Sequence, residues 1–400
     1  MSGTEGLRIG IDGTCLASGR GYGRFLRELL PPLLADPGAH RYVLFVDEAT
    51  AARSDLPDMP TERMATGRSQ AEAASGEGAR SPLDLWRMGR GVARHPLDVF
   101  YFPSVFSWFP IPGRVPTAVA IHDTIPERHG AIVFPRRINR WLWRLKSWAA
   151  RRRARTIITV SDYARRQLET VLGIDPGKIF VTPEAPSPAF SPVSGAGPRE
   201  AWLTVHGLAP DAATFLFVGG VNPHKNVEGL IRALATLGPD ATGREAQLLL
   251  VGSYDTDTFH ADTASIRAEI ARHGLAERVH WVGFVPDGDL RHLYAGCIAV
   301  VLPAFEEGFG LPAVEAAACG APCVATRESP LPEVLEGGGC FFDPHDDQDL
   351  ARALAALWED RATRDALAER ALDRARELDW AITARATRAA LEATARGGRP

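Results

Sequence analysis

Pro303-Ala-Phe-Glu-Glu-Gly-Phe-Gly-Leu-Pro-Ala-Val-Glu315 is the stretch of sequence from which the fold of this chain can be inferred. An apolar run, Ile298 to Leu302, precedes it, and Gly320 follows it. Proline suits the first turn of a helix and glycine suits the residue after the last turn, so the stretch predicts a strand, a loop and a short helix. The backbone N–H groups of Gly310 and Leu311 would then lie at a helix start, where the peptide dipoles favour an anion such as a phosphate.

Two glutamates of this stretch, Glu307 on the loop and Glu315 in the helix, lie eight positions apart. A carboxylate beside an anion site is suited to binding hydroxyl groups, which sugars supply. The stretch resembles the E-x7-E signature of retaining glycosyltransferases of family 4, which have the GT-B fold. The resemblance implies that Glu307 contacts the donor sugar and Glu315 the nucleotide ribose. It also implies that the residues between them line the donor site: Gly308, Phe309, Gly310 and Leu311. An exposed acidic turn and a solvated helix face are the alternative interpretation.

Strands and helices alternate in both halves of the chain, which predicts an α/β protein with two doubly wound parallel sheets. A length of 400 residues also favours two domains over one. The resemblance implies two Rossmann-like domains that face a central cleft. We expect an acceptor-binding domain over residues 1–190, a nucleotide-sugar-binding domain over residues 199–377, and a C-terminal helix within residues 378–400 that crosses back to the first domain. Prolines gather between residues 183 and 198, where we expect the linker.

The composition is that of an ordinary globular protein, with 45% hydrophobic and 24% charged residues. A formal net charge of −4 offers no basic surface for a nucleic acid, so we expect no nucleic-acid partner. Residues 1–6 lead directly into an apolar strand, which leaves no room for a signal peptide, and no apolar run is long enough to span a membrane. We therefore expect a cytoplasmic protein, with the inner face of the cell membrane as a second location that stays open.

The first half of the chain carries its own strand-end pair, His122-Asp123, after the apolar run that begins at Thr117. Ligands of open parallel sheets bind at the carboxyl ends of the strands. The resemblance implies that His122 contacts the transferred sugar, and it makes Asp123 a candidate for binding the acceptor. A simple cap at the strand end is the alternative.

Glycines near the N-terminus, in Gly19-Arg-Gly-Tyr-Gly23, predict a turn before a helix from Arg24 to Leu34. A glycine-rich turn before a helix suits an anion, although it is also common as a plain tight turn. The resemblance implies that Gly21 and Gly23 lie across the cleft from the diphosphate of the donor.

The loop Gly219-Gly-Val-Asn-Pro-His-Lys-Asn226 follows a strand and precedes a helix. An ammonium group at such a helix start suits a diphosphate. The loop resembles the phosphate loop of family 4, except that Gly220 and His224 stand where arginine is frequent, which leaves Lys225 as the only permanent cation in the loop. The resemblance also implies that residues after the strand from Val279 frame the nucleobase: Gly283, Phe284 and Val285. Packing in the core is an equal alternative for Phe284.

Residues 136–155 contain nine basic residues and three tryptophans. Helical spacing places Trp141, Leu145 and Trp148 on one face and most arginines toward another. Two interpretations stay open. The tryptophans could pack on the sheet beneath a solvated arginine face, or the segment could lie on an anionic membrane surface as a peripheral contact.

The resemblance implies a retaining glycosyltransferase that moves a hexose, of mannosyl or glucosyl type, from UDP or GDP to an acceptor hydroxyl. The acceptor is a glycan, a lipid-linked sugar or a small molecule, as in polysaccharide biosynthesis. His122, Lys225 and Glu307 are the expected catalytic residues. Lysine and helix dipole would stabilise the leaving group, so no metal and no further cofactor is expected. A sugar phosphorylase or nucleotide-sugar epimerase of the same fold, and a nucleotide-sugar-binding protein without activity, are the alternatives.

Overall fold

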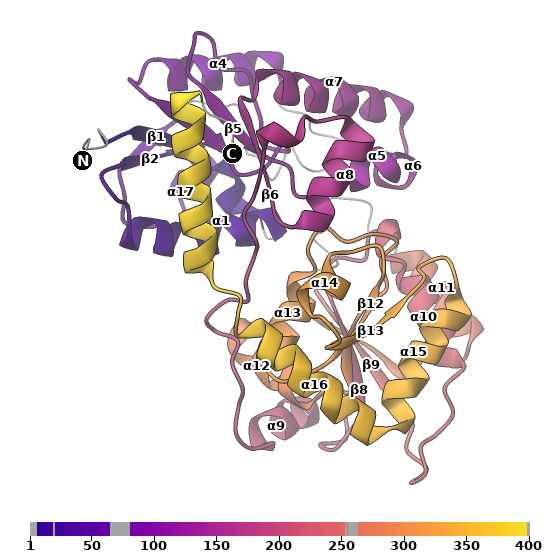
Figure 1. The fold of residues 1–400 in the computed structure, drawn as a ribbon. Helices are drawn as coiled ribbons and strands as arrows, with labels where there is room; N and C mark the ends of the chain where they lie inside the picture. Colours follow the sequence, from indigo (N-terminus) through magenta and orange to yellow (C-terminus); the bar gives the residue numbers. More distant parts are fainter. Residues whose placement is uncertain (1–5, 19–20, 65–80, 253, 255–262, 398–400) are drawn as a thin grey trace. The chain divides into compact units, whose positions relative to one another are not determined.

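The structure is a computed structural model that describes residues 6–18, 21–64, 81–252, 254 and 263–397 (Figure 1). The chain divides into two compact units, Met1–Glu184 with Trp380–Pro400, and Ala185–Asp379. We call them the first and the second domain. Each domain is built on one sheet whose described strand pairs are all parallel, which confirms the predicted α/β architecture.

The sheet of the first domain has the order β3-β2-β1-β4-β5-β6-β7. Its strands are β1 (Arg8–Asp12), β2 (Arg41–Val46), β3 (Thr61–Arg63), β4 (Val99–Phe102), β5 (Thr117–Ala120), β6 (Thr156–Thr159) and β7 (Ile179–Val181). The chain builds β1 to β3 in one direction and then returns to place β4 on the other side of β1. In a doubly wound sheet this reversal, here between β1 and β4, opens a crevice at the carboxyl ends of the strands.

Helices of the first domain include the C-terminal one, α17, which packs on α1 (Figure 1). The helical segments are η1 (Thr14–Ala17), α1 (Gly21–Ala35), α2 (Glu48–Ala51), α4 (Pro82–Ala93), α5 (Ile125–Arg128), α6 (Gly130–Val133), α7 (Arg137–Arg153), α8 (Asp162–Leu172), η2 (Pro176–Lys178) and α17 (Trp380–Arg396). Arg155 donates to the Thr394 carbonyl at 2.9 Å, which ties the end of α17 to this domain. The predicted return of the C-terminal helix to the first domain is confirmed.

The sheet of the second domain has the order β10-β9-β8-β11-β12-β13. Its strands are β8 (Thr214–Val218), β9 (Gln247–Val251), β10 (Val279–Gly283), β11 (Ala299–Leu302), β12 (Cys323–Thr326) and β13 (Gly339–Phe342). Its helical segments are α9 (Gly197–Val205), η3 (Pro223–Lys225), α10 (Val227–Ala235), α11 (Thr263–Arg272), α12 (Asp287–Gly296), α13 (Leu311–Ala318), α14 (Leu331–Val334), α15 (Asp347–Glu359) and α16 (Arg361–Ala375). The direction of winding reverses between β8 and β11.

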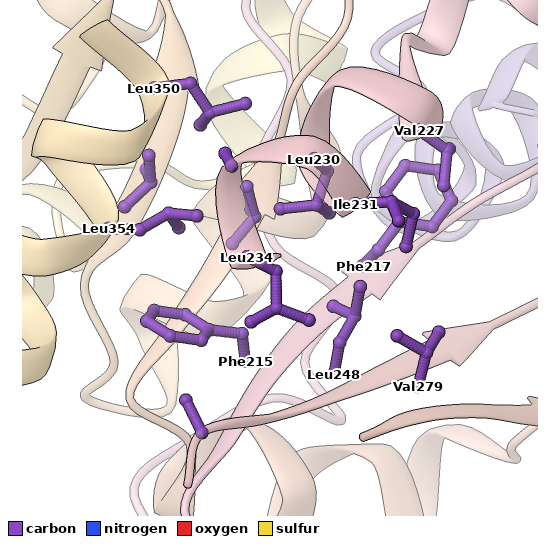
Figure 2. Packing of buried hydrophobic residues seen from close by; sticks show 14 of the residues in the cluster. Phe215, Phe217, Val227, Leu230, Ile231, Leu234, Leu248, Val279, Leu350 and Leu354 are labelled. Atoms are coloured by element: carbon purple, nitrogen blue, oxygen red, sulfur yellow. The ribbon is translucent and has the colours of Figure 1, made fainter. Parts of the chain in front are cut away.

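One face of this second sheet is covered by α10, whose apolar side chains pack on β8 (Figure 2). Leu230 and Leu234 of α10 are fully buried together with Phe215 of β8. Leucine and phenylalanine side chains of this size contribute about 1.5–3 kcal/mol each when they leave water. The packing holds the start of α10, and with it the loop after β8, at the carboxyl edge of the sheet.

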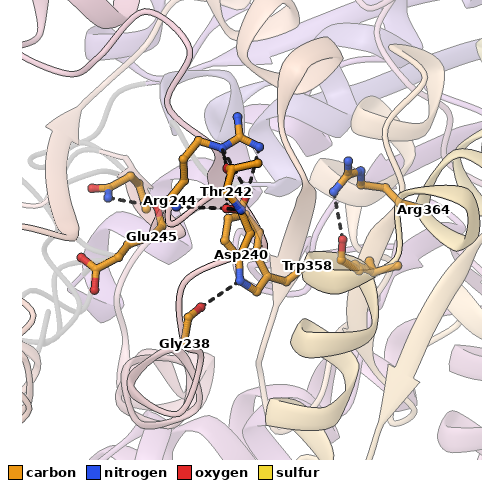
Figure 3. Close-up of polar contacts among 9 residues, drawn as sticks. Gly238, Asp240, Thr242, Arg244, Glu245, Trp358 and Arg364 are labelled. Carbon is orange, nitrogen blue, oxygen red and sulfur yellow. Dashed lines mark hydrogen bonds and ion pairs between the residues drawn. The ribbon is translucent and has the colours of Figure 1, made fainter.

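The turn between α10 and β9 is held by its own polar contacts (Figure 3). Asp240 accepts from the Thr242 hydroxyl at 2.6 Å and from the Arg244 backbone N–H at 3.0 Å, and these bonds lower the pKa of its carboxyl group. Trp358 of α15 donates its indole N–H to the Gly238 carbonyl at 3.0 Å. The far end of α10 is thereby joined to α15, away from the carboxyl edge of the sheet.

The predicted turn at Gly19–Gly23 is wrong in its second half, because Gly21 and Gly23 belong to the first turn of α1. Gly19 lies outside the described residues. A Cβ atom on Gly23 would lie 2.2 Å from the Ser18 carbonyl oxygen. Close packing of α1 against the preceding segment therefore explains this glycine without a ligand.

The structure of α7 decides between the two interpretations of residues 136–155 as to which face packs on the sheet. Trp143, Ser147 and Ala150 are buried, whereas Trp141 is 59% and Trp148 51% exposed. The indole N–H of Trp143 donates to Glu127 at 2.9 Å, and a buried tryptophan needs such a partner. The interpretation in which Trp141 and Trp148 pack on the sheet is wrong.

Several basic side chains of α7 reach backbone carbonyls in place of open solvent. Lys146 donates to the Phe106 carbonyl at 2.7 Å, and Arg151 donates to the Leu172 carbonyl at 2.8 Å. Loop and helix-end carbonyls need such donors, because no helix or sheet partner satisfies them. Among the helices in the described ranges, none combines the length and the apolar content that crossing a membrane requires.

Candidate active site

The second domain brings two charged side chains into contact at the point where its sheet reverses. Lys225 lies in the loop after β8, and Glu307 lies in the loop after β11, the neighbouring strand. The Lys225 ammonium nitrogen is 2.7 Å from the Glu307 Oε1 atom, and the two side chains are 23% and 10% exposed. In an ion pair that is mostly buried but partly exposed, either side chain can exchange its partner for a ligand of matching charge.

Backbone contacts fix the loops that carry this pair. The Lys225 N–H donates to the Asn222 carbonyl at 2.8 Å, and Asn226 adopts a left-handed conformation with φ of 51° before α10 begins. The Phe305 N–H donates to the His224 carbonyl at 3.0 Å, which joins the two loops directly. The Glu307 N–H donates to the Glu328 carbonyl at 3.0 Å. The ion pair is thus positioned by main chain, and the two side chains need little reorganisation.

The helix after Glu307 begins as the sequence predicts. Gly310 is the N-cap residue of α13, with φ of 92°, and Pro312 lies in the first turn. A Cβ atom on Gly310 would lie 2.8 Å from Leu331, so both the conformation and the space require glycine. Helix geometry leaves the first backbone N–H groups, including that of Leu311, without acceptors inside the helix. This end of α13 is therefore suited to an anion.

The other donor-site candidates of this stretch are largely buried. Glu315 is buried in α13, and its Oε2 atom accepts from the Tyr294 hydroxyl at 3.3 Å. Phe309 and Leu311 are also buried, while Gly308 is half-buried. The carboxylate of Glu315 is thus held by a neighbour in α12, and a ribose hydroxyl would have to replace the tyrosine hydroxyl to reach it.

Candidates for the base site lie at the end of β10 and differ in exposure. Phe284 is 72% exposed, so its alternative as a core residue is wrong. Val285 is buried, and Gly283 ends the strand with φ of 73°. Sequence analysis missed Gly252. A Cβ atom at this position would lie 2.3 Å from the carbonyl oxygen of Gly219, the residue before Gly220, so a larger side chain would disturb the loop after β8. Its signal is a glycine at the end of the strand beside β8.

His122 follows β5 in the first domain, and both of its ring nitrogens have partners. Nε2 lies 2.9 Å from the Pro103 carbonyl oxygen, and Nδ1 lies 3.3 Å from Glu184 Oε1. Burial lowers the pKa of His122, but the hydrogen bond and charge of Glu184, with Pro103 and Asp123, outweigh it, so that the pKa is raised. Asp123 Oδ1 accepts from the Ile125 N–H at 3.0 Å, which is the capping role that the alternative interpretation expected.

Glu184 is a residue that sequence analysis missed, although it contacts His122. It lies 62 positions further along the chain, within the proline cluster where the sequence predicts the linker. The only available signal was an isolated acid in Pro183-Glu-Ala-Pro186, at the end of β7. Nothing in that pattern identifies a partner for it.

A cavity of about 400 Å³ lies beside the Lys225 loop in the second domain. Its lining is polar apart from Phe305 and Pro344. The full set is Asn226, Arg232, Phe305, Pro344, His345, Asp346, Asp347 and Gln348. Across the part of the chain that the structure covers, no three His, Cys, Asp or Glu side chains are grouped so as to hold a metal ion.

Two parallel Rossmann-like domains with a C-terminal helix returning to the first define the GT-B class of fold. Comparison with solved structures agrees. Sucrose-phosphate synthase from Thermosynechococcus elongatus superposes with a TM-score of 0.74 at 20% identity, covering 94% of this chain and 96% of that one. Anabaena Alr3699/HepE in complex with UDP-glucose superposes with a TM-score of 0.72 at 21% identity, covering 96% and 98%.

Sequence comparison identifies the family. The family described as "Glycosyl transferases group 1" matches residues 198–374, and "Glycosyltransferase Family 4" matches residues 21–185. O-antigen chain mannosyltransferase B from Escherichia coli is 31% identical over 228 residues, which is 57% of this chain and 58% of that protein. The chain thus matches less than two thirds of that relative's length. It belongs to the family 4-type glycosyltransferases, as the E-x7-E signature predicted.

Proposed function

We propose that this protein transfers a hexose from a nucleotide diphosphate sugar to an acceptor hydroxyl with retention of anomeric configuration. The observation that carries the proposal is the contact between Lys225 and Glu307 next to the N-terminus of α13. A cation and a helix start suit a diphosphate, and an adjoining carboxylate suits sugar hydroxyls. One small region of the second domain thus offers a group for each part of a donor.

In this proposal each candidate residue has a role toward the donor. Lys225 and the N–H groups of Gly310 and Leu311 bind the diphosphate, and Glu307 binds hydroxyls of the sugar. Glu315 binds the ribose by exchanging the Tyr294 hydroxyl for a ribose hydroxyl. The remaining donor-site candidates approach the base or the phosphates: Gly220, His224, Gly283, Phe284, Val285, Gly308 and Phe309. His122 of the first domain contacts the transferred sugar, and Asp123 faces the acceptor.

Retention follows from attack on the same face of the sugar that the diphosphate leaves. As the bond between the anomeric carbon and the phosphate oxygen breaks, the acceptor oxygen bonds to that carbon, and its proton passes to the departing phosphate oxygen. Positioning and charge stabilisation of the leaving group then account for the catalysis. Lys225 and the helix dipole supply the charge, so the scheme requires no divalent metal, and activity should survive EDTA.

The donor and acceptor classes are inferred from relatives. One similar solved protein is named as a complex with UDP-glucose, and the Escherichia coli relative is named as an O-antigen chain mannosyltransferase. We infer a UDP- or GDP-hexose as the donor and a glycan, lipid-linked sugar or small molecule as the acceptor.

A thermal-shift series with UDP, GDP, UDP-glucose and GDP-mannose tests the donor, and release of nucleotide diphosphate from the stabilising donor then tests the reaction. We expect stabilisation by one nucleotide class and turnover that Lys225→Ala and Glu307→Gln remove. Lys178→Ala, which removes an exposed lysine of the first domain, is the matched control and should behave like the wild type. Stabilisation by no nucleotide sugar would overturn the proposal, whereas binding with unchanged donor would favour a protein without activity. Phosphate-dependent cleavage of a disaccharide would favour a phosphorylase, and epimerised donor an epimerase.

For the location of the protein we propose peripheral contact of α7 with an anionic lipid surface. The exposed apolar side chains of α7 recur at helical spacing and form one continuous stripe: Ile138, Trp141, Leu142, Leu145 and Trp148. Exposed arginines such as Arg137, Arg144 and Arg152 flank the stripe. Helices that lie in the headgroup region of anionic membranes combine tryptophan and leucine on one face with arginine beside them.

Sedimentation with vesicles tests this contact. We expect binding to vesicles of phosphatidylglycerol and phosphatidylcholine at low salt, weaker binding at high salt, and no binding to phosphatidylcholine alone. The double variant Trp141→Ser with Leu145→Ser should lose most of the binding, whereas Val205→Ser, an exposed apolar residue of the second domain, should not. Equal sedimentation of the double variant, or concentration-dependent dimerisation lost in that variant, would assign the stripe to another partner.

A further inference from the structure

We propose that Glu184 is a positioning residue for the transfer reaction: its carboxylate fixes the His122 ring and keeps that ring doubly protonated and positively charged. The inference rests on the proposed function, in which His122 meets the transferred sugar. Glu184 itself is buried and lies behind the histidine, so it acts through His122.

With Glu184 ionised, hydrogen-bond chemistry selects the charged form of the ring. Nε2 faces the Pro103 carbonyl oxygen at 2.9 Å, and Nδ1 faces the Glu184 carboxylate oxygen at 3.3 Å. Both partners accept hydrogen bonds only, since a carbonyl and an ionised carboxylate carry no proton. A neutral imidazole has a single N–H and would place a lone pair against one of these oxygens. The imidazolium satisfies both contacts.

The surroundings strengthen this pair. The edge of the Phe25 ring meets the His122 ring at a centroid distance of 4.9 Å, and Phe25 in turn packs against Trp380 of α17. Apolar neighbours lower the local dielectric constant, which strengthens an ion pair whose members are both bonded. Asp123 also raises the pKa of His122. The Tyr101 hydroxyl lies near both Glu184 and Cys15. Burial raises the pKa of Tyr101, so the tyrosine stays neutral near neutral pH.

Contacts of the two residues before Glu184 hold it in place. The Thr182 N–H donates to the Thr159 carbonyl at 2.7 Å, which continues the sheet to within two residues of Glu184. The Pro183 carbonyl accepts from the Thr383 hydroxyl of α17. Glu184 is therefore fixed where the chain leaves the first domain and beside the helix by which it returns.

A second histidine–glutamate pair in the same domain shows that this arrangement is specific. His40 Nε2 lies 2.8 Å from Glu392, but His40 Nδ1 accepts from the Leu7 N–H at 3.1 Å. Since Nδ1 must keep its lone pair for that N–H, this geometry selects the neutral ring. Two pairs of the same residue types thus hold different forms of histidine, because one ring faces two acceptors and the other faces one acceptor and one donor.

For the reaction, a charged His122 presents a fixed N–H donor to a sugar oxygen. The ring is 16% exposed, so one edge is open to a ligand. When a sugar oxygen approaches, the Nε2–H group donates to it, either together with the Pro103 carbonyl or in its place. The contact of Nδ1 with Glu184 keeps the ring in position. A neutral ring has one N–H group, so it would lose either the hydrogen bond to Glu184 or the N–H that donates to the sugar.

The experiment is an NMR titration of the histidine ring signals in wild type, Glu184→Gln and Glu392→Gln, with His122→Asn used to assign the signal. The glutamine keeps the shape and an accepting oxygen but removes the charge. We expect His122 to titrate above about 6.5 in the wild type and at clearly lower pH in Glu184→Gln, with no change in Glu392→Gln. An unchanged His122 titration in folded Glu184→Gln would overturn the proposal, whether or not the protein is a transferase.

The pH profile of kcat/KM provides the readout that links the pair to transfer. In Glu184→Gln we expect the alkaline limb to move to lower pH, with activity at about pH 6 within a few-fold of the wild type. Glu184→Asp, which keeps the charge, should return the limb toward the wild-type position. A uniform loss of activity at all pH values would instead assign Glu184 a purely structural role.

Discussion

Each domain places a glutamate against a basic side chain at the carboxyl edge of its parallel sheet, but the two pairs are built differently. In the second domain Lys225 meets Glu307 at 2.7 Å, and the two side chains are 23% and 10% exposed. In the first domain His122 meets Glu184 at 3.3 Å, with the carboxylate buried. Lysine ordinarily keeps its charge up to about pH 10, whereas histidine changes its charge near neutral pH. The second-domain pair is thus suited to constant leaving-group binding, and the first-domain pair makes its domain sensitive to pH.

The largest expected effect comes from breaking the second-domain pair. Lys225→Ala should lower kcat/KM by about 10²–10³, since one stabilising group at a developing charge contributes about 2.7–4 kcal/mol. Lysine and glutamate side chains ordinarily keep their charges over this range, so the loss should be the same at about pH 6 and about pH 9. Steady-state kinetics at the two pH values measures it. A loss of kcat/KM at only one of the two pH values would show that the pair of Lys225 and Glu307 is also sensitive to pH, as is the pair of His122 and Glu184.

The second-domain pair also depends on backbone that only glycine allows. Gly310→Ala should destabilise the protein by about 1–3 kcal/mol, because the added Cβ atom meets Leu331 at 2.8 Å in a left-handed conformation. Gly320→Ala is the matched control, since Gly320 has a similar φ of 83° with open space around it. Chemical denaturation of both variants measures the difference. Equal losses would mean that the conformation alone, and no contact with Leu331, requires glycine at position 310.

The first-domain pair should make stability depend on pH. The folded pKa of His122 is raised above its usual 6.5, so its contribution is fully present below pH 6.5 and is lost as pH rises through the folded pKa. A histidine whose pKa is one pH unit higher in the folded state stabilises that state by about 1.4 kcal/mol while it is protonated. Hydrogen-exchange protection of β5 and β7, corrected for the intrinsic pH dependence of exchange, measures this loss. In Glu184→Gln the protection should depend less on pH, and an unchanged dependence would contradict the assignment.

The smallest effect is expected from the pair of His40 and Glu392. Glu392→Gln keeps an oxygen that accepts from His40 Nε2–H, so stability should change by less than about 1 kcal/mol. The change should be similar at about pH 6 and about pH 8, because Nδ1 accepts from the Leu7 N–H and Nε2 can donate to either side chain. Parallel denaturation of wild type and variant at two pH values checks this. A loss that grows as the pH falls would assign the charged form to His40 as well.

Much of the fold could be predicted from local patterns. The apolar run before Pro303 and the proline and glycine around α13 predicted that helix and its ends, because those residues restrict the backbone in the same way in any protein. Lys225, Glu307 and His122 were found because each lies in the loop after a strand, where parallel sheets bind ligands, and because the residues around them resemble family 4 motifs. The turn predicted at Gly21 and Gly23 was wrong, because both residues belong to α1, where Gly23 allows close packing against the preceding segment.

By itself the sequence determined the strands, the helices and the strand-end residues of this protein, since backbone restriction and apolar periodicity act over a few neighbouring residues. Only the tertiary structure decided which of those residues meet. Glu184 reaches His122 across 62 positions because β7 and β5 end at the same edge of the sheet with only β6 between them, and Lys225 reaches Glu307 because β8 lies next to β11. Tertiary packing likewise decided which face of α7 is exposed. The buried face contains Trp143, whose indole N–H donates to Glu127, and the opposite face is therefore exposed. Pairing and burial are properties of neighbours in space, which local periodicity does not contain.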